Sequence, residues 1–143
     1  MSRTGADVVV VGAGVIGCAL ARELTQAQLR VVVIDRDEPG AGASGAAAGI
    51  LSPQAEADGP SPLLALGLES RSMFPALVED LRGETGIDVP YRASGTLVIA
   101  LDNEEEALLE KRYAWQTAAG LPVERLSAGR VATLEPALAA GGV

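Results

Sequence analysis

The chain has 143 residues, of which 48% are hydrophobic, and it carries a formal net charge of −8. This length is sufficient for one ordinary domain with a hydrophobic core, whereas the acidic balance argues against nucleic acids and anionic membranes as partners. The sequence contains no histidine, which excludes the metal, nucleophilic and acid–base chemistry that depends on an imidazole.

The N-terminal stretch predicts a β-α-β unit. Residues 7–11 include four consecutive valines, which suit a strand buried on both faces of a parallel sheet. A G-x-G-x-x-G turn follows, and apolar residues at helical spacing predict a helix over residues 14–28 with one face toward the sheet. A second strand over residues 30–34 leads into Asp35. This order of elements is typical of dinucleotide-binding units, and a glycine-rich turn in a ligand-free α/β domain is the alternative.

The residues of this motif have distinct physical roles in such a unit. Gly12 allows a sharp turn, Gly14 lets the backbone approach a pyrophosphate, and Gly17 lets the helix pack closely on the strand. The first turn of the helix then offers free N–H groups to the phosphates. Asp35 is placed to accept hydrogen bonds from ribose hydroxyls and would repel a 2′-phosphate, which disfavours an NADP-type ligand.

Cys18 is the only cysteine of the chain, so an intrachain disulfide is impossible. Its position directly after Gly17 predicts a small, buried hydrophobic side chain rather than a reactive thiol. The N-terminal apolar run is too short to span a bilayer, and no signal peptide is recognisable. We therefore expect a cytoplasmic protein.

Residues 37–60 consist largely of alanine, glycine and other small residues. Such a segment is compatible with a flexible linker and equally with a cradle whose backbone presses against a flat ligand. Ser44 is placed to cap a short helix over residues 45–49 and to donate a hydrogen bond to a phosphate.

Two long helices are predicted in the rest of the chain. Ser61 is the expected N-cap of a helix that ends near Arg82, and Asp102 is the expected N-cap of one that ends at Ala119. Glu105 completes a capping box with Asp102. Some large apolar side chains of these helices are expected to be buried in the hydrophobic core, namely Leu66, Met73, Phe74 and Trp115.

Shorter elements are predicted between and after these helices. Residues 87–102 contain alternating apolar residues and a Gly-Thr-Leu sequence, which predict two strands. Residues 121–126 are expected to form a short strand, and residues 127–135 a last helix that ends before a proline. No converging set of metal ligands is predicted anywhere in the chain.

These motifs together resemble the FAD-dependent D-amino-acid oxidase superfamily, and most closely the glycine oxidases of thiamine biosynthesis. The resemblance is carried by the glycine motif at residues 12–17, the small residues at 42–56, the Gly-Thr-Leu sequence at 95–97 and the Leu-Glu-Pro sequence at 134–136. It covers nearly the whole chain. The fold class that it implies is α/β, with the first half of a Rossmann-like FAD-binding fold followed by the start of an α+β substrate domain.

The resemblance implies FAD as cofactor and places it along the N-terminal part of the chain. It implies that the pyrophosphate contacts the glycine motif, at Gly12, Gly14, Val15, Ile16 and Gly17, and that Ala43 and Ser44 contact the pyrophosphate side of the cofactor. It also implies that the ribose contacts Asp35 and that the adenine contacts Arg36. The flavin ring would contact Ala48, Gly49 and Ile50. These contacts favour a cradle over a linker for residues 37–60. Family members often carry methionine at the position of Ile50, so the apolar wall between flavin and substrate has a different shape here.

Complete members of the superfamily are much longer than this chain. The chain therefore resembles an N-terminal fragment, with residues 1–86 in the FAD-binding domain and residues 87–143 in a truncated substrate domain. For the longer parent, the resemblance implies oxidative deamination of glycine or a small D- or N-methyl amino acid to a 2-oxo acid, ammonia and hydrogen peroxide, with oxygen as electron acceptor and a homo-oligomeric enzyme.

No catalytic side chain can be assigned within the 143 residues, because the substrate-binding arginine of the family lies in the C-terminal part. We expect the fragment by itself to be inactive. The alternatives are an FAD-dependent amino-acid dehydrogenase that passes electrons to another carrier, and a nucleotide-binding module without catalysis.

Overall fold

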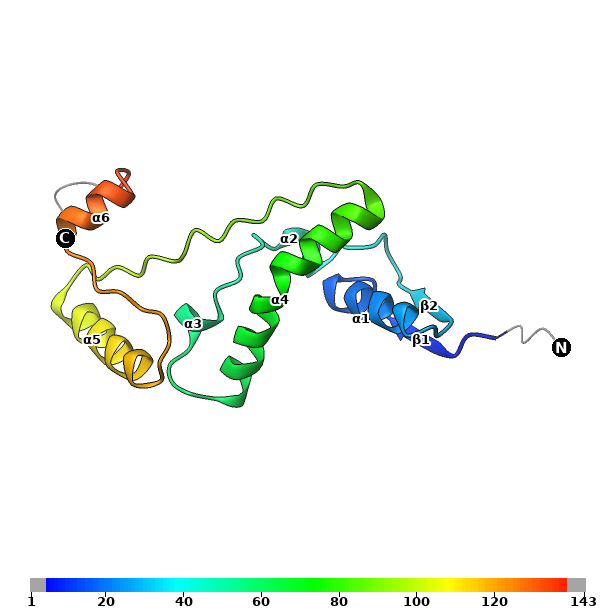
Figure 1. Cartoon of the computed structure of the whole chain (residues 1–143), viewed down its shortest axis with the longest axis horizontal. Helices are drawn as coiled ribbons and strands as arrows, with labels where there is room; N and C mark the ends of the chain where they lie inside the picture. Colours follow the sequence, from blue (N-terminus) through cyan, green and yellow to red (C-terminus); the bar gives the residue numbers. More distant parts are fainter. Residues whose placement is uncertain (1–4, 139–143) are drawn as a thin grey trace. The chain divides into compact units, whose positions relative to one another are not determined.

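The computed structural model of the chain describes residues 5–138. These residues form two compact units, with the boundary between Ile50 and Leu51 (Figure 1). The predicted domain boundary between residues 86 and 87 falls inside the second unit and stays a prediction. Residues 1–4 and 139–143, which belong to the two predicted domains, lie outside the described residues.

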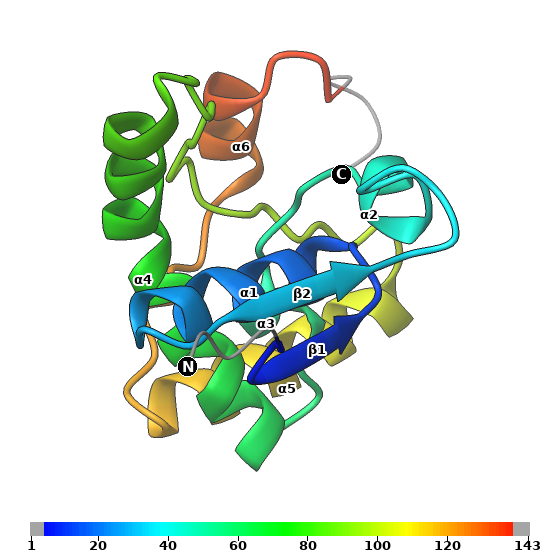
Figure 2. The ribbon, with the colours of Figure 1, turned by 90° about the vertical axis from the view of Figure 1, so that its right-hand side faces the viewer.

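The first unit contains the predicted β-α-β arrangement. Strands β1 (Val8–Val11) and β2 (Val31–Ile34) are parallel, with Val8 opposite Val31. Helix α1 (Val15–Gln26) connects the strands and contacts both of them (Figure 2). A short helix, α2 (Ala43–Ala46), follows β2. The predicted order of elements is therefore confirmed, with boundaries that shift by one or two residues.

An ion pair joins the chain before β1 to the chain before β2. The Asp7 carboxylate accepts hydrogen bonds from the backbone N–H of Arg30 at 3.0 Å and from the guanidinium Nη2 of the same residue at 2.9 Å. The backbone N–H of Asp7 donates in return to the carbonyl oxygen of Arg30 at 2.8 Å. The side-chain and backbone donors of Arg30 lower the pKa of Asp7 to about 2. This pair fixes the start of the parallel register.

The expected burial of the first unit is wrong in several places. Of β1, only Val10 is buried, whereas Val11 is 80% exposed. Ile16 on α1 is 81% exposed, and Cys18 is also exposed. Burial on both faces of a strand requires a layer on each side, and within the described part of this unit one helix packs against two strands. The hydrophobic pattern thus predicts the elements correctly and their burial incorrectly.

The second unit is helical. Its helices are α3 (Pro53–Glu56), α4 (Pro62–Thr85), α5 (Asn103–Ala118) and α6 (Ala128–Leu134). The hydroxyl of Ser61 accepts from the Leu64 N–H at 3.1 Å, which confirms the predicted N-cap of α4. Glycine at position 86 ends this helix in the left-handed conformation at φ 71°.

Helix α5 also begins where the sequence predicts. The Asp102 carboxylate accepts from the N–H groups of Glu104 and Glu105, both at 2.9 Å. The side chain of Glu105 accepts from the Leu101 N–H at 2.7 Å, one residue before the position that a capping box requires. Ser127 accepts from the Arg130 N–H at 3.4 Å and so caps α6.

Polar contacts connect α3 with α5. The Gln54 side-chain amide donates to the Gln116 side-chain oxygen at 2.9 Å, and the buried Gln116 amide donates to the Gln54 carbonyl oxygen at 3.3 Å. The Arg112 guanidinium donates to the Ala55 carbonyl oxygen at 2.9 Å. Among the described residues of this unit, the buried apolar ones are Leu64 and Val78 of α4.

Three expectations for the second unit are wrong. Residues 87–102 and 121–126 form no strand, because a strand needs a partner for its N–H and C=O groups and the described residues provide none. Leu66 and Met73 are 64% and 63% exposed rather than buried. By contrast, the Phe74 ring stacks on that of Tyr91, with the two centroids 6.4 Å apart.

Candidate functional site

The glycine turn lies between β1 and α1, and two of its glycines are required by the geometry. Gly12 has a φ of +108°, which side-chain-bearing residues rarely adopt, and its N–H donates to the Ile34 carbonyl oxygen at 2.8 Å. A Cβ atom at Gly17 would overlap the backbone carbonyl oxygen of Gly12. The close approach of α1 to the end of β1, which the motif predicts, therefore depends on the missing side chain at Gly17.

Asp35 lies at the end of β2 and holds the glycine turn from across the sheet. Its Oδ2 accepts from the Ala13 N–H at 2.6 Å, and its Oδ1 accepts from the Asp37 N–H at 3.0 Å. The Ala13 N–H is the main cause that lowers the pKa of the Asp35 carboxyl below its ordinary value. The residue as a whole is exposed. The sequence predicted its position but not its bond to the glycine turn.

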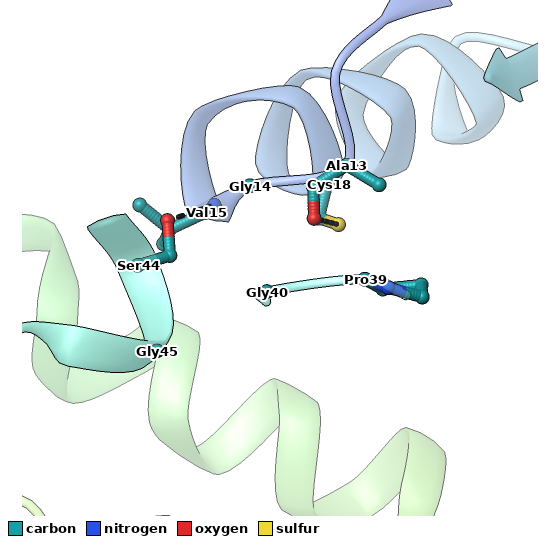
Figure 3. Close-up of a pocket in the computed structure, with 8 residues that line it drawn as sticks. All are labelled: Ala13, Gly14, Val15, Cys18, Pro39, Gly40, Ser44 and Gly45. Atoms are coloured by element: carbon teal, nitrogen blue, oxygen red, sulfur yellow. Dashed lines mark hydrogen bonds between the residues drawn. The ribbon is translucent and has the colours of Figure 1, made fainter. Parts of the chain in front are cut away.

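The segment after β2 folds back onto the same turn. The Gly40 N–H donates to the Ala13 carbonyl oxygen at 3.0 Å. Further along, the Ser44 hydroxyl oxygen accepts from the Val15 N–H at 2.9 Å (Figure 3). Both bonds join residues of the glycine turn to the small-residue segment, so this part of the segment is an ordered wall rather than a flexible linker.

The expected capping role of Ser44 in its own helix is wrong. Helix α2 spans Ala43–Ala46 instead of residues 45–49, and its N-cap is Gly42 without a side-chain hydrogen bond. Ser44 therefore lies inside the helix. Its hydroxyl is directed to α1 instead (Figure 3).

An open hollow of about 440 Å³ lies between the glycine turn and this segment. It is lined by Ala13, Gly14, Val15, Cys18, Pro39, Gly40, Ser44 and Gly45 (Figure 3). Of the predicted site residues, Gly14, Val15 and Ser44 are thus brought together, whereas Gly12 and Gly17 do not line the hollow. The lining residues Pro39 and Gly40 were not predicted, although a Pro-Gly pair is a recognised turn signal.

The other predicted residues are placed differently. Arg36 is 92% exposed at its side chain and pairs with Asp37 at 3.2 Å. Ile16 and Ile50 are 81% and 74% exposed and do not line the hollow. The predicted contacts outside the hollow also include Ala43, Ala48 and Gly49. Of the predicted pyrophosphate contacts, Gly14, Val15 and Ser44 line the hollow, whereas Ile16 and Ala43 lie outside it, as do the predicted flavin contacts.

The chemistry of the hollow suits an anionic, phosphate-containing group. Its lining has no acidic side chain, and it includes the first residue of α1, where helical geometry leaves N–H groups without an intrahelical acceptor. Gly14 presents no Cβ atom, and the hydroxyl of Ser44 lies 3.0 Å from the place that this atom would occupy. Residues 5–138 contain no group of three or more acidic, cysteine or histidine side chains arranged for a metal ion.

No helix in the described part of the chain is both long and apolar enough to cross a membrane.

Comparisons with known proteins give one consistent family. Residues 7–143 match the family described as DAO, FAD dependent oxidoreductase. The chain is 42% identical to a glycine oxidase of Geobacillus kaustophilus over 94% of this chain and 36% of that protein. It is 44% identical to the bifunctional protein ThiO/ThiG of Synechocystis sp. over 66% of this chain and 15% of that one.

A solved structure gives the same result for the fold. The crystal structure of glycine oxidase from Geobacillus kaustophilus matches with a TM-score of 0.90 and 42% identity, over 94% of this chain and 36% of that chain. This confirms the predicted Rossmann-like α/β class. The chain spans 36% of the length of this relative.

Proposed function

Because this chain belongs to the family of FAD-dependent oxidoreductases, we propose that it forms the nucleotide-binding part of an enzyme that oxidises glycine or a small D- or N-methyl amino acid. The observation that carries the proposal is the hollow at the glycine turn, whose residues Gly14, Val15 and Ser44 come from two segments. Similarity to glycine oxidases supports the choice of substrate. Similarity to the ThiO/ThiG protein supports the expected link to thiamine biosynthesis.

The residues around the hollow would hold the pyrophosphate and ribose of FAD. The backbone of Gly14 and the N-terminus of α1 would face the phosphates, and the hydroxyl of Ser44 would lie beside them. Asp35, which is an exposed residue, would accept hydrogen bonds from the ribose. Arg36 would reach the adenine from an exposed position, and Ile50 would extend along the flavin.

Bound FAD would supply the electron acceptor for oxidation of the amine carbon. The residues of this chain would bind and orient the cofactor, and none of them is proposed to exchange a proton with the substrate. Oxygen is the proposed final electron acceptor. The longer parent protein is proposed to be a homo-oligomer, and its proposed location is the cytoplasm. Since the chain spans 36% of the glycine oxidase relative, we expect these residues alone to bind the cofactor without turning over glycine.

FAD binding tests the proposal most directly. The chain is titrated into FAD and flavin fluorescence is recorded, with ADP as a competitor because it contains the ribose and pyrophosphate but no flavin. We expect saturable binding that ADP displaces and that Gly17→Ala abolishes. Equal binding by the wild type and Gly17→Ala would show that the flavin associates elsewhere and would contradict the proposed site.

Peroxide formation tests the expected lack of turnover. The FAD-loaded chain is incubated with glycine, sarcosine and D-alanine under oxygen, and hydrogen peroxide is measured with a peroxidase dye. We expect no signal above that of free FAD. Glycine-dependent peroxide would show that the 143 residues hold a complete catalytic site. The chain would then be an oxidase by itself rather than only the nucleotide-binding part of one.

A further inference from the structure

Helix α1 begins without a side-chain cap of its own. Its N-cap is Gly14, which makes no side-chain hydrogen bond. The hydroxyl oxygen of Ser44 accepts from the N–H of Val15, the first helical residue, at 2.9 Å from 29 positions further along the chain. A serine in a different element thus provides the acceptor for one of the N–H groups that the start of a helix leaves without an intrahelical partner.

The missing side chain at Gly14 makes room for this hydroxyl. A Cβ atom at Gly14 would lie 3.0 Å from the Ser44 Oγ, and no other atom would lie within 4 Å. The close neighbour is therefore the hydroxyl itself, rather than the backbone. Gly14 and Ser44 form a matched pair, in which the glycine leaves space and the serine fills it.

The hydroxyl of Ser44 has unused hydrogen-bonding capacity on the side of the hollow. A serine hydroxyl has one donor hydrogen and two acceptor lone pairs. The bond to Val15 uses the oxygen as an acceptor, so the hydrogen stays available for donation. Ser44 also lines the hollow together with Gly14 and Val15 (Figure 3).

We propose that Ser44 is a positioning residue that caps α1 across the hollow and holds α2 against the glycine turn before any nucleotide binds. A second consequence rests on the proposed function. Once a pyrophosphate enters the hollow, the same hydroxyl donates its hydrogen to a phosphate oxygen while its oxygen still accepts from Val15. Ser44 then connects the helix to the ligand. Because residues 39–45 are already ordered in the free protein, binding does not lose the conformational entropy of ordering them.

Amide hydrogen exchange of the nucleotide-free chain tests the capping role. In the wild type we expect slower exchange at the Val15 N–H than at the N–H groups of Ile16 and Gly17, which have no intrahelical acceptor. Ser44→Ala should remove this protection, and Ser44→Thr should restore it because threonine keeps the hydroxyl. Ser72→Ala is the matched control, since the Ser72 hydroxyl donates only to the Glu69 carbonyl oxygen three residues earlier.

A double-mutant cycle tests the matched pair independently of amide exchange. Gly14→Ala should destabilise the wild type by pushing on the hydroxyl, and it should cost clearly less in the Ser44→Ala background, where the hydroxyl is gone. Additive effects of the two substitutions would overturn the matched pair. Val15 exchange that is as fast as that of Ile16 in the wild type would overturn the cap.

FAD affinity separates this inference from the proposed function. Loss of a hydrogen bond to a charged phosphate predicts a Kd about tenfold higher for Ser44→Ala, with Ser44→Thr near the wild type. An unchanged Kd in Ser44→Ala would overturn the donation to phosphate. A wild type that is protected at Val15 but binds no FAD would contradict the proposed function and the donation to phosphate, and it would support the cap.

Discussion

The candidate site of the first unit and the helix starts of the second unit are held by hydrogen bonds of different range. In the first unit, Asp35 bonds to Ala13 over 22 positions and Ser44 bonds to Val15 over 29. In the second, the Ser61 cap reaches three positions along the chain. Distant segments therefore define the candidate site, whereas local contacts define the starts of the long helices. We expect substitutions in the first unit to disturb several segments at once, and substitutions at a cap to stay local.

The two units can be observed separately. The only tryptophan of the chain, Trp115, belongs to α5 in the second unit, where it is half-buried. Its fluorescence during denaturation therefore reports on that unit. The backbone amides of Ala13 and Val15 report on the first unit in exchange measurements. Each substitution is expected to change the signal of its own unit more than the signal of the other unit.

The largest effect is expected for Gly17→Ala. The added methyl group would overlap the Gly12 carbonyl oxygen, so either α1 or the glycine turn must move. Overpacking of this kind costs about 3 kcal/mol. We expect loss of amide protection at Ala13 and loss of FAD binding, with an unchanged denaturation midpoint for Trp115 fluorescence.

Gly5→Ala is the matched control for Gly17→Ala, because a Cβ atom at Gly5 meets nothing within 4 Å. It should leave amide protection and FAD binding unchanged. A parallel shift of the Trp115 midpoint in Gly17→Ala would show that the two units unfold together and would contradict their independence.

The second expected effect is that of Asp35→Asn. The amide keeps one acceptor oxygen for Ala13 but removes the negative charge that would bind ribose hydroxyls. We expect the Kd for FAD to rise about tenfold, as for loss of one charge-assisted hydrogen bond, and the first unit to remain folded. Fluorescence titration gives the Kd, and Ala13 amide exchange reports on the fold.

Asp37→Asn provides a control for the loss of charge, because the Asp37 carboxylate pairs with the exposed Arg36 side chain rather than with the glycine turn. It should leave the Kd for FAD near that of the wild type. If Asp35→Asn also binds FAD as the wild type does, Asp35 does not hold the ribose. Its function would then be limited to the bonds with the Ala13 and Asp37 N–H groups.

The sequence predicts those features that depend on near neighbours. Ser61 and Asp102 could be identified as caps because the N–H groups they accept from lie within the next three residues. The glycine turn could be found because its spacing is fixed by the geometry of one strand and one helix. Strands over residues 87–102 were wrongly predicted, since a strand depends on a partner that the sequence pattern of the segment itself does not reveal.

In the candidate site, too, the sequence predicts local features and not contacts between distant segments. Gly14 and Asp35 follow from the motif, but the bonds of Asp35 to Ala13 and of Ser44 to Val15 join segments whose approach no local pattern reveals. Cys18 was expected to be buried because it follows Gly17, whereas the exposure of a helical residue is set by whatever covers that face. The identity of site residues was therefore more predictable than their contacts.

Acid is expected to weaken the first unit through Asp7. Its pKa is lowered from the model-peptide value of 3.8 to about 2 in the folded chain, mainly by the Arg30 side chain. A lowered pKa stabilises the fold at pH values above 3.8, and this contribution is lost as the pH falls toward about 2. Amide protection in β1 should decrease over this pH range. It should decrease less in Asp7→Asn, whose amide protection is already lower at neutral pH.

Glu69→Gln on α4 is the control for Asp7→Asn, because Glu69 lies on an exposed position of the second unit. It should leave the acid response of β1 unchanged. An identical acid response in the wild type and in Asp7→Asn would show that the Asp7–Arg30 pair does not fix the parallel register.

The smallest expected effect lies in the second unit and has the opposite sign. Gly83 is inside α4, and a Cβ atom there meets nothing within 4 Å. Gly83→Ala should stabilise the unit by about 0.5–1 kcal/mol, because alanine has the higher helix propensity and loses less chain entropy. The Trp115 midpoint in urea measures the change.

Gly67→Ala is the decisive partner variant, since it gains the same helix propensity in the same helix. A Cβ atom at Gly67 would lie 2.8 Å from the Cβ atom of Pro53 on α3, so the added methyl group must displace that contact. We therefore expect Gly67→Ala to destabilise the second unit while Gly83→Ala stabilises it. If both variants stabilise it, α3 gives way at little cost, and the second unit is held by its helices individually rather than by the packing of α3 on α4.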